Sequence, residues 1–461
     1  MVELVLRDTR YLENYGCHQP HSTLALEASQ AVSEGQTVFK FFKLTFDPAA
    51  GTQLLKEVPE DNWRLTFKGR TSLNLSFNLT PGYYLLFASD DGHEPSALPL
   101  VVTDRTKPAD VAVIRPVFTQ WSYHSAGFYF NEYRSLADRT LMRIGSRGRA
   151  GRLTERMLRQ AAGKLRLPKI NFPYRPFPAH TVISLQGFYR RNNRWDRLLW
   201  DARLGRLEGL WVDEVLSGMP VFAMLDKNDV PYHVFTDVDL HNQNPALASY
   251  RVLVFSGQEG MTPSYYRMLQ QLQAGGRTSF LLWGVQAFGY RQLNYEAETG
   301  ELTYVGTRGR QGMWGDQLSG SQPEWGDEGK LFGFHFPEPQ SASWRYDKPY
   351  ARIVVSQPDH PITRGDRRPG KTYHYEVRDL AGTSHPGLTW AGGEVQQRVA
   401  PEARVIAHLD DDSQIIGIGE YRNTIIFSPT YLPAFFAYQS EQHPEIEEWF
   451  MAALEYLTRV E

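Results

Sequence analysis

The chain has 461 residues and a formal net charge of −3 at pH 7, with 41% apolar and 22% charged residues. These values are ordinary for a soluble globular protein of about two to four domains, and they argue against a protein that coats nucleic acid. The single cysteine, Cys17, excludes an internal disulfide and a cysteine-based zinc site, so a metal would need histidine, carboxylate or tyrosine ligands. No apolar run reaches the ~18 residues of a membrane span, and "MVELVLRDTR" lacks the apolar stretch of a signal peptide, so we expect a cytoplasmic protein.

Residues 1–108 have the pattern of an all-β region. Short alternating runs such as "TVFKFFKLTF", "NWRLTFKG", "TSLNLSFNLT" and "GYYLLFAS" are separated by turn clusters, and none sustains a helical period. They predict an antiparallel, Ig-like β-sandwich. The polar stretch "DRTKPAD" that follows them predicts a domain boundary.

Residues 109–291 change to alternating strands and helices. The runs "VAVIRP", "PYHVFTD", "YRVLVFSG" and "RTSFLLWG" predict buried strands. Helices are predicted for "WDRLLWDARLGRLEGLWVDEVLSG" (195–218) with its continuation, and for "PSYYRMLQQLQAGG". This order predicts an α/β domain with a parallel sheet covered on both faces. Ligands of such sheets bind outside the carboxyl ends of the strands, where we expect loops such as "FTQWSYHSAG", "TDVDLHNQ" and "SGQEGMTP".

Beyond these residues, the composition turns to Gly, Trp, Pro and hairpin signals. We expect a loop-rich insertion of β-hairpins over 292–400. Residues 401–461 then predict a return to the α/β domain and a terminal helix, "PEIEEWFMAALEYLTRV".

Glu259 follows the strand run "YRVLVFSG" and is the first candidate for chemistry. A carboxylate at a strand end could bind a metal or act as a general base. It could equally be a loop acid that caps the helix starting near Pro263.

Polar residues also follow the preceding strand run. Asp237 and Asp239 lie two positions apart, with His241 two positions further, a spacing that resembles that of metal ligands. The alternative, which we favour, is that Asp239 or Asn242 starts the next helix and His241 packs under it.

Two other strand ends carry candidates that could line a site. Tyr123 and His124 follow the first strand of the α/β region, although a buried tyrosine with a satisfied hydroxyl is the commoner case. Gln286 lies in "WGVQAFG", the turn after the last of these strand runs. That turn has no Cys, Ser or Thr and thus lacks the nucleophile of a strand-end elbow, which excludes glutaminase chemistry.

The segment 139–169 holds ten Lys or Arg residues and a single acid, Glu155. It could face a phosphate, an acidic polymer or an acidic partner. A solvated surface excursion is the plainer alternative.

The run Asp237-Val-Asp-Leu-His241, followed by Tyr250-Arg-Val-Leu253 and then Glu259, resembles a segment of the large (beta) subunit of N,N-dimethylformamidase and its relatives. Weaker similarity extends over residues 60–300. The resemblance implies a β-sandwich followed by a flavodoxin-like domain similar to class I glutamine amidotransferases.

The resemblance also implies a mononuclear iron held by two tyrosines and one glutamate. By residue matching, Glu259 falls on the glutamate and Tyr123 on the first tyrosine. The segment of the second tyrosine reads Arg175-Pro176-Phe177 here, so Tyr174 is the nearest substitute. The position of the family's histidine near the glutamate reads Gly257.

Two functions follow from these residues. The first is a metal-assisted hydrolase that acts on a C–N bond of a small-molecule amide, with Glu259 as ligand or base. The second is a non-catalytic binding or assembly module that kept the fold and lost the metal. A homo-oligomer and a small partner subunit are both compatible with the sequence, whereas a nucleic-acid or membrane partner is not expected.

Overall fold

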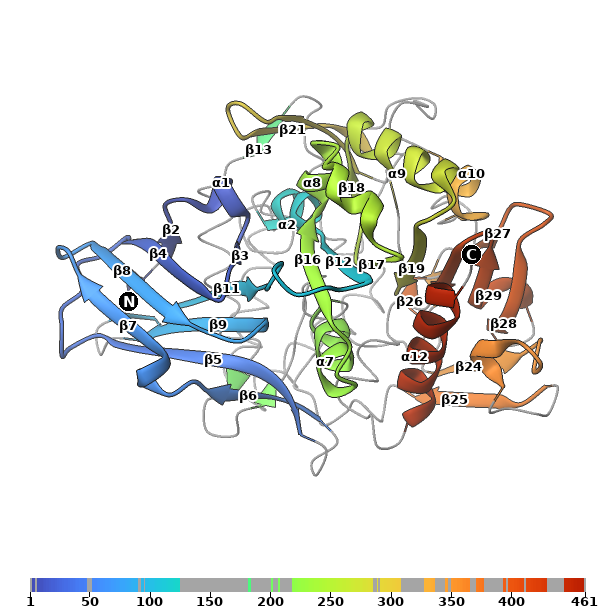
Figure 1. Cartoon of the computed structure of the whole chain (residues 1–461), viewed down its shortest axis with the longest axis horizontal. Coiled ribbons are helices and arrows are strands. Elements are labelled where there is room, and N and C mark those ends of the chain that lie inside the picture. Colours follow the sequence, from blue (N-terminus) through green and yellow to red (C-terminus); the bar gives the residue numbers. More distant parts are fainter. Residues whose placement is uncertain are drawn as a thin grey trace, which may run out of the picture.

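The structure is a computed structural model of the whole chain (Figure 1). It describes residues 2–124, 218–307, 327–335, 350–364, 370–376, 397–409, 412–428 and 443–459. Within these ranges, residues 5, 48–51, 90–92, 95, 285–287 and 289–290 are not described. Five short strand pieces are also described, at 181–183, 200–201, 206–207, 345–346 and 393–394. The basic segment 139–169 lies outside the described residues. The protein is a mixed α/β protein in which strands predominate.

Two sheets pack face to face in the N-terminal region, drawn in blue in Figure 1. One sheet contains β2 (Leu6–Asp8), β4 (His21–Ala28), β8 (Ser72–Asn78) and β7 (Trp63–Phe67). The other contains β6 (Thr52–Glu57), β5 (Val38–Asp47), β9 (Gly82–Ser89), β11 (Ser96–Val102) and β3 (Cys17–His18). Alternate residues such as Leu75 and Phe41 share one core, as the alternating sequence runs predicted.

A parallel sheet forms the centre of the molecule. Five strands lie side by side and each neighbouring pair is parallel, in the order β16 (Tyr232–Thr236), β12 (Val111–Arg115), β17 (Val252–Ser256), β19 (Ser279–Trp283) and β30 (Thr424–Phe427). Every residue of these strands is buried. Both faces of the sheet are therefore covered, which explains why the strands read as continuous apolar runs.

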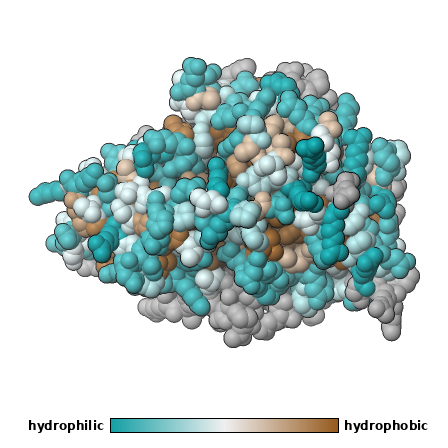
Figure 2. All heavy atoms as spheres, viewed as in Figure 1, coloured by the Kyte–Doolittle hydropathy of each residue, from teal (hydrophilic) through white to brown (hydrophobic). Residues whose placement is uncertain are grey.

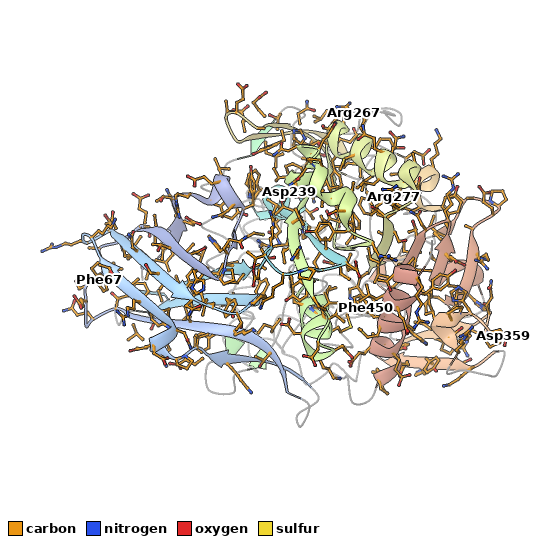
Figure 3. All side chains as sticks on the ribbon, in the orientation of Figure 1. Phe67, Asp239, Arg267, Arg277, Asp359 and Phe450 are labelled. Atoms are coloured by element: carbon orange, nitrogen blue, oxygen red, sulfur yellow. The ribbon has the colours of Figure 1, made fainter. Side chains whose placement is uncertain are left out.

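Helices cover the two faces of this sheet. One face packs on α7 (Met219–Lys227) and α12 (Pro444–Arg459), whose Phe450 is labelled in Figure 3. Trp283 contacts Phe427 and Phe450 there, with ring centroids 5.0 Å apart in both pairs. The other face packs on α2 (Val117–His124), α8 (Asp237–His241), α9 (Pro263–Gly275) and α10 (Glu328–Phe332).

The central sheet continues as antiparallel strands beyond β30. They are β29 (Asp412–Tyr421), β28 (Arg404–Leu409), β24 (Tyr350–Val355) and β25 (Thr372–Glu376). A smaller sheet contains β13 (Thr181–Ile183), β21 (Glu301–Thr307), β20 (Arg291–Glu296) and β18 (Gly260–Met261). It brings the hairpin β20–β21 next to the loop that carries Glu259.

Short elements complete the described fold. They are β1 (Val2–Glu3), α1 (Tyr11–Asn14), η1 (Glu60–Asn62), β10 (His93–Glu94), η3 (Pro245–Ser249), β22 (Phe334–His335), β23 (Arg345–Tyr346), η5 (Pro361–Thr363), β26 (Gly393–Glu394) and β27 (Gln397–Arg398).

The helix predicted from residue 195 onward is wrong at the described positions 200–201 and 206–207, whereas its continuation forms α7. Strands β14 (Trp200–Asp201) and β15 (Arg206–Leu207) pair with each other, and Arg206 pairs with Leu54 at the edge of the sandwich. An unpaired sheet edge offers backbone partners that outweigh a local helical preference.

The face seen in Figure 2 is largely hydrophilic, with apolar residues in small groups. Within the described ranges, no helix combines the length and apolar character needed to cross a bilayer.

Candidate functional site at the carboxyl edge of the parallel sheet

Three adjacent strands of the parallel sheet end close together. Helix α2 follows β12, α8 follows β16, and β18 follows β17. These elements gather at the upper end of β16 in Figure 1, and Asp239 marks that end in Figure 3. The carboxyl edge of the sheet thus brings together segments that are far apart in the sequence.

Glu259 lies in the turn between β17 and β18. Its Oε2 is 3.6 Å from Nε of Arg291, the first residue of β20, and the two side chains are only 13% and 3% exposed. The main chain joins the same residues, because the amide of Arg291 donates to the carbonyl of Glu259 at 3.1 Å. The buried guanidinium stabilises the negative charge of the carboxylate.

Contacts on both sides fix the turn that carries Glu259. Thr119 of α2 accepts hydrogen bonds from the amides of Glu259 and Gly260, both at 2.9 Å. The fully buried Gln258 donates to the carbonyl of Ile114 at 3.0 Å. Gly257 has a φ of +66°, a left-handed conformation that favours glycine over residues with a side chain.

The alternative that Glu259 caps the following helix is wrong. Thr262 is the N-cap of α9, and its hydroxyl accepts from the amide of Tyr265 at 3.2 Å. A threonine directly before the helix satisfies this amide, so the cap does not require a carboxylate.

Asp237 is completely buried at the start of α8 and caps α2 rather than its own helix. Its Oδ2 accepts from the amide of Phe118 at 2.9 Å. Burial raises the pKa of Asp237 well above its usual value, although hydrogen bonds from the amides of Phe118, Val117 and Val238 act in the opposite direction. The carboxyl group therefore joins two helices at the edge of the sheet.

Asp239 and His241 have structural roles, but the expectation that Asp239 or Asn242 starts the helix is wrong, because Thr236 is the N-cap of α8 and Asn242 is its C-cap. Thr236 and Asp239 form a capping box at the start of α8. Nδ1 of His241 is 2.7 Å from the hydroxyl of Thr262, and burial followed by the charge of Arg267 lowers the pKa of His241. The structure does not bring Asp237, Asp239 and His241 together as a set of metal ligands.

Aromatic residues surround His241. Tyr295 lies 5.2 Å from it and 5.3 Å from Phe118, measured between ring centroids. The hydroxyl of Tyr295 is 2.8 Å from that of Tyr15, which comes from the N-terminal region, and the rings of both tyrosines lie 6.1 Å from Trp121. The sandwich thus contributes to this edge of the sheet.

The remaining predicted residues are only partly described. Tyr123 and His124 form the last two positions of α2, so the loop expected at this point is a helix. Tyr174 and Gln286 lie outside the described residues. Within the part of the chain that is described, no three His, Cys, Asp or Glu residues are grouped closely enough to hold a metal ion.

Sequence reasoning missed Thr119 and Arg291. Thr119 lies in "FTQWSYHSAG", a segment in which Tyr123 and His124 are the candidate site residues. Arg291 follows the strand end at "WGVQAFGY" and gives no signal of its own. Only the pairing of β18 with β20 shows that Arg291 belongs to the surroundings of Glu259.

A β-sandwich beside a parallel sheet with a carboxylate at its carboxyl edge defines a mixed α/β protein with a strand-end site. The chain belongs to the N,N-dimethylformamidase beta subunit-like family, whose C-terminal family model matches residues 34–414. At the level of the family, this membership supports a hydrolase-like function. A comparison with curated proteins gave no match.

Solved structures give low similarities. The Ig1-2 module of the Drosophila receptor protein tyrosine phosphatase DLAR aligns with 11% identity and a TM-score of 0.16, over 24% of this chain and 60% of that one. A Bacteroides ovatus GH5 xyloglucanase aligns with 9% identity and a TM-score of 0.15, over 61% of this chain and 65% of that one. The chain spans less than two thirds of either structure.

Proposed function

We propose that the protein is a metal-assisted hydrolase that acts on a C–N bond of a small amide. The observation that carries the proposal is the placement of Glu259 at the carboxyl end of β17, in direct hydrogen-bond contact with the helix that contains Tyr123. Membership of the N,N-dimethylformamidase beta subunit-like family supports the same chemistry.

The family resemblance supplies the ligand set of the proposed iron site, one glutamate and two tyrosines. Glu259, Tyr123 and Tyr174 would hold the ion, which when bound supplies Lewis-acid activation of water or of the amide carbonyl. Tyr123 follows Thr119 by four residues, so the two positions lie on one face of α2, about one turn apart. The hydrogen bond from the amide of Glu259 to Thr119 supports the proposal, because it joins the Glu259 turn to the helix that contains Tyr123.

Arg291 and the surrounding core would perform the remaining roles. The Arg291 guanidinium balances the charge of Glu259 and keeps its carboxylate in one orientation. Burial excludes bulk water and strengthens electrostatic interactions at the site.

The proposal extends to the organisation of the chain. We take the parallel strand order as that of a flavodoxin-like, amidotransferase-like domain over 109–291, completed by 401–461. Residues 1–108 would form the sandwich domain, and 292–400 the insertion.

One observation favours the second function, a non-catalytic binding module. The Glu259 carboxylate already has a cationic partner in Arg291, so the site can hold its charge without a metal. A protein that had lost its iron would retain this ion pair.

Metal analysis separates the two functions. Protein purified without chelator should contain about one iron per chain, and Glu259→Ala should lose it because a carboxylate ligand is removed. A tyrosine–iron(III) site should also absorb visible light. Glu301→Ala is the matched control, since Glu301 is an exposed carboxylate on β21. A colourless, metal-free wild-type protein would rule out the hydrolase proposal in favour of the binding module.

A further inference from the structure

The hydroxyl of Thr119 connects the two segments that carry the candidate ligands. Thr119 is completely buried in α2, and its Oγ1 accepts hydrogen bonds from two consecutive amides, those of Glu259 and Gly260, at 2.9 Å each. Two bonds to adjacent amides define both the position and the direction of the turn.

The main chain of β18 also lies directly against α2. A Cβ atom at Gly260 would be 3.1 Å from the backbone carbon of Phe118 and 3.1 Å from the backbone nitrogen of Thr119. A side chain at this position would therefore require the turn or α2 to move by a few tenths of an ångström, and Cδ1 of Leu293, at 2.9 Å, would have to move as well. Gly260 and the Thr119 hydroxyl therefore hold the Glu259 turn and α2 at one fixed separation.

This separation matters for metal binding because ligand distances are tolerated within only about ±0.2 Å. We propose that Thr119 is a positioning residue, whose hydroxyl sets Glu259 relative to the α2 face that carries Tyr123. The inference rests on the proposed function. Thr119 itself touches neither metal nor substrate in this proposal.

A merely structural role for Thr119 makes a different prediction. If the hydroxyl only satisfied two buried amides, its removal would lower stability and leave the metal affinity of the folded protein unchanged. Positioning residues around metal ligands instead typically change affinity by about 10- to 100-fold.

Thr119→Val provides the test, since it keeps the branched shape and removes the hydroxyl. Thr119→Ser keeps the hydroxyl and should have the iron affinity and absorption band of the wild type. Thr103→Val is the matched control, because Thr103 is equally buried and its hydroxyl accepts from the amide of Val234, away from the candidate ligands. Iron affinity is measured by chelator competition, and the tyrosine–iron(III) absorption band gives an independent readout.

We expect Thr119→Val to bind iron at least about tenfold more weakly and to shift or lose the absorption band. Thr119→Ser and Thr103→Val should retain both properties. Unchanged iron affinity in a folded Thr119→Val protein would overturn the inference. If Thr119→Val does not fold, Gly260→Ala replaces it, since the added Cβ pushes the turn away from α2 and should weaken iron binding similarly.

Hydrogen exchange separates failure of this inference from failure of the proposed function. The amides of Glu259 and Gly260 should exchange faster in Thr119→Val than in wild type, with or without iron. A metal-free wild type would refute the hydrolase proposal, while faster exchange in the variant would still show that the Thr119 hydroxyl holds the turn; only weaker iron binding by the folded variant shows that this contact positions a ligand. Equal exchange in the two proteins would overturn the positioning role.

Discussion

Glu259 and Arg291 form an ion pair that joins the end of β17 to the start of β20, with 3.6 Å between Oε2 and Nε. Few side chains of opposite charge in the described residues are both so little exposed, at 13% and 3%. Removing one partner of a buried pair is more costly than removing a surface pair, because the other charge loses compensation in a medium of low polarity.

We therefore expect Glu259→Gln and Arg291→Gln each to lower the free energy of unfolding by about 2–4 kcal/mol. The double variant should lose less than the sum, because the two residues interact directly. Urea denaturation measures all three effects. The exposed pair Lys40–Glu57 is the control, and its single variants should cost less than about 1 kcal/mol. Additive losses at Glu259 and Arg291 would contradict the coupling.

Asp237→Asn should change the pH dependence of stability. Burial raises the pKa of Asp237 in the folded protein above its usual 3.8, so the folded state binds the proton more tightly than the unfolded state. The contribution of the protonated carboxyl group to the free energy of unfolding is fully present below pH 3.8 and is lost as the pH rises. Asn cannot ionise and avoids that loss.

The stability of Asp237→Asn relative to wild type should therefore increase between about pH 4 and pH 8. Asp237→Ala should instead be less stable by about 1–2 kcal/mol, because the amide of Phe118 loses its capping acceptor. Denaturant unfolding of the three proteins at a series of pH values measures both effects. If the difference in unfolding free energy between Asp237→Asn and wild type does not change with pH, Asp237 does not titrate in this range.

His18 should make the N-terminal region sensitive to acid. Burial, followed by the charges of Arg115 and Arg10, lowers the pKa of His18 from 6.5 to about 3. The unfolded state therefore binds more protons, and stability is lost as the pH falls from 6.5 toward 3. The slope is at most about 1.4 kcal/mol per pH unit.

His18→Gln should flatten this loss between pH 7 and about pH 5, measured by urea unfolding. Oδ2 of Asp8 lies 3.8 Å from Nε2 of His18. Burial raises the pKa of Asp8, so protonation of Asp8 favours the folded state as the pH falls, opposite to the effect of His18. The exposed His21 is the control, and His21→Gln should retain the wild-type profile. An unchanged acid slope in His18→Gln would refute the assignment.

Glu420 should anchor the terminal helix α12 to the sheet. The hydroxyl of Tyr456 donates to its Oε1 at 2.7 Å, and Nε2 of His360 lies 3.4 Å from its Oε2. Arg404 pairs with the same oxygen. Glu420→Gln should lower the free energy of unfolding by about 2–4 kcal/mol, since a buried charge network is broken.

Amide exchange along α12 measures the loss of anchoring. Residues of this helix should exchange faster in Glu420→Gln, whereas Glu455→Gln, which removes an exposed partner of Arg459, should leave the exchange rates unchanged. Exchange in α12 that is unaffected by Glu420→Gln would mean that apolar packing alone holds the helix.

The sequence by itself determined the elements whose signals are local. Helix α9 begins after Thr262 and ends at Gly276, which has a φ of +68°, and both residues are recognisable cap types. The apolar runs of the parallel strands are equally local. The position of Glu259 after a strand could be predicted for the same reason.

Tertiary structure alone decided which residues surround Glu259. Arg291 reaches it through the pairing of β18 with β20, and Thr119 through the packing of α2. Asp237 likewise caps a helix that is distant in sequence. No spacing rule connects such residues, because their contacts depend on the register and packing of separate elements.

The segment 195–218 shows the same limit for secondary structure. Its local pattern predicts a helix, but Arg206 pairs with Leu54 at the edge of the sandwich. Helical preference amounts to less than about 1 kcal/mol per residue and can be overridden by a distant strand that supplies backbone partners. Short-range spacing thus determines helices, caps and buried strands, whereas contacts between distant segments determine the candidate site.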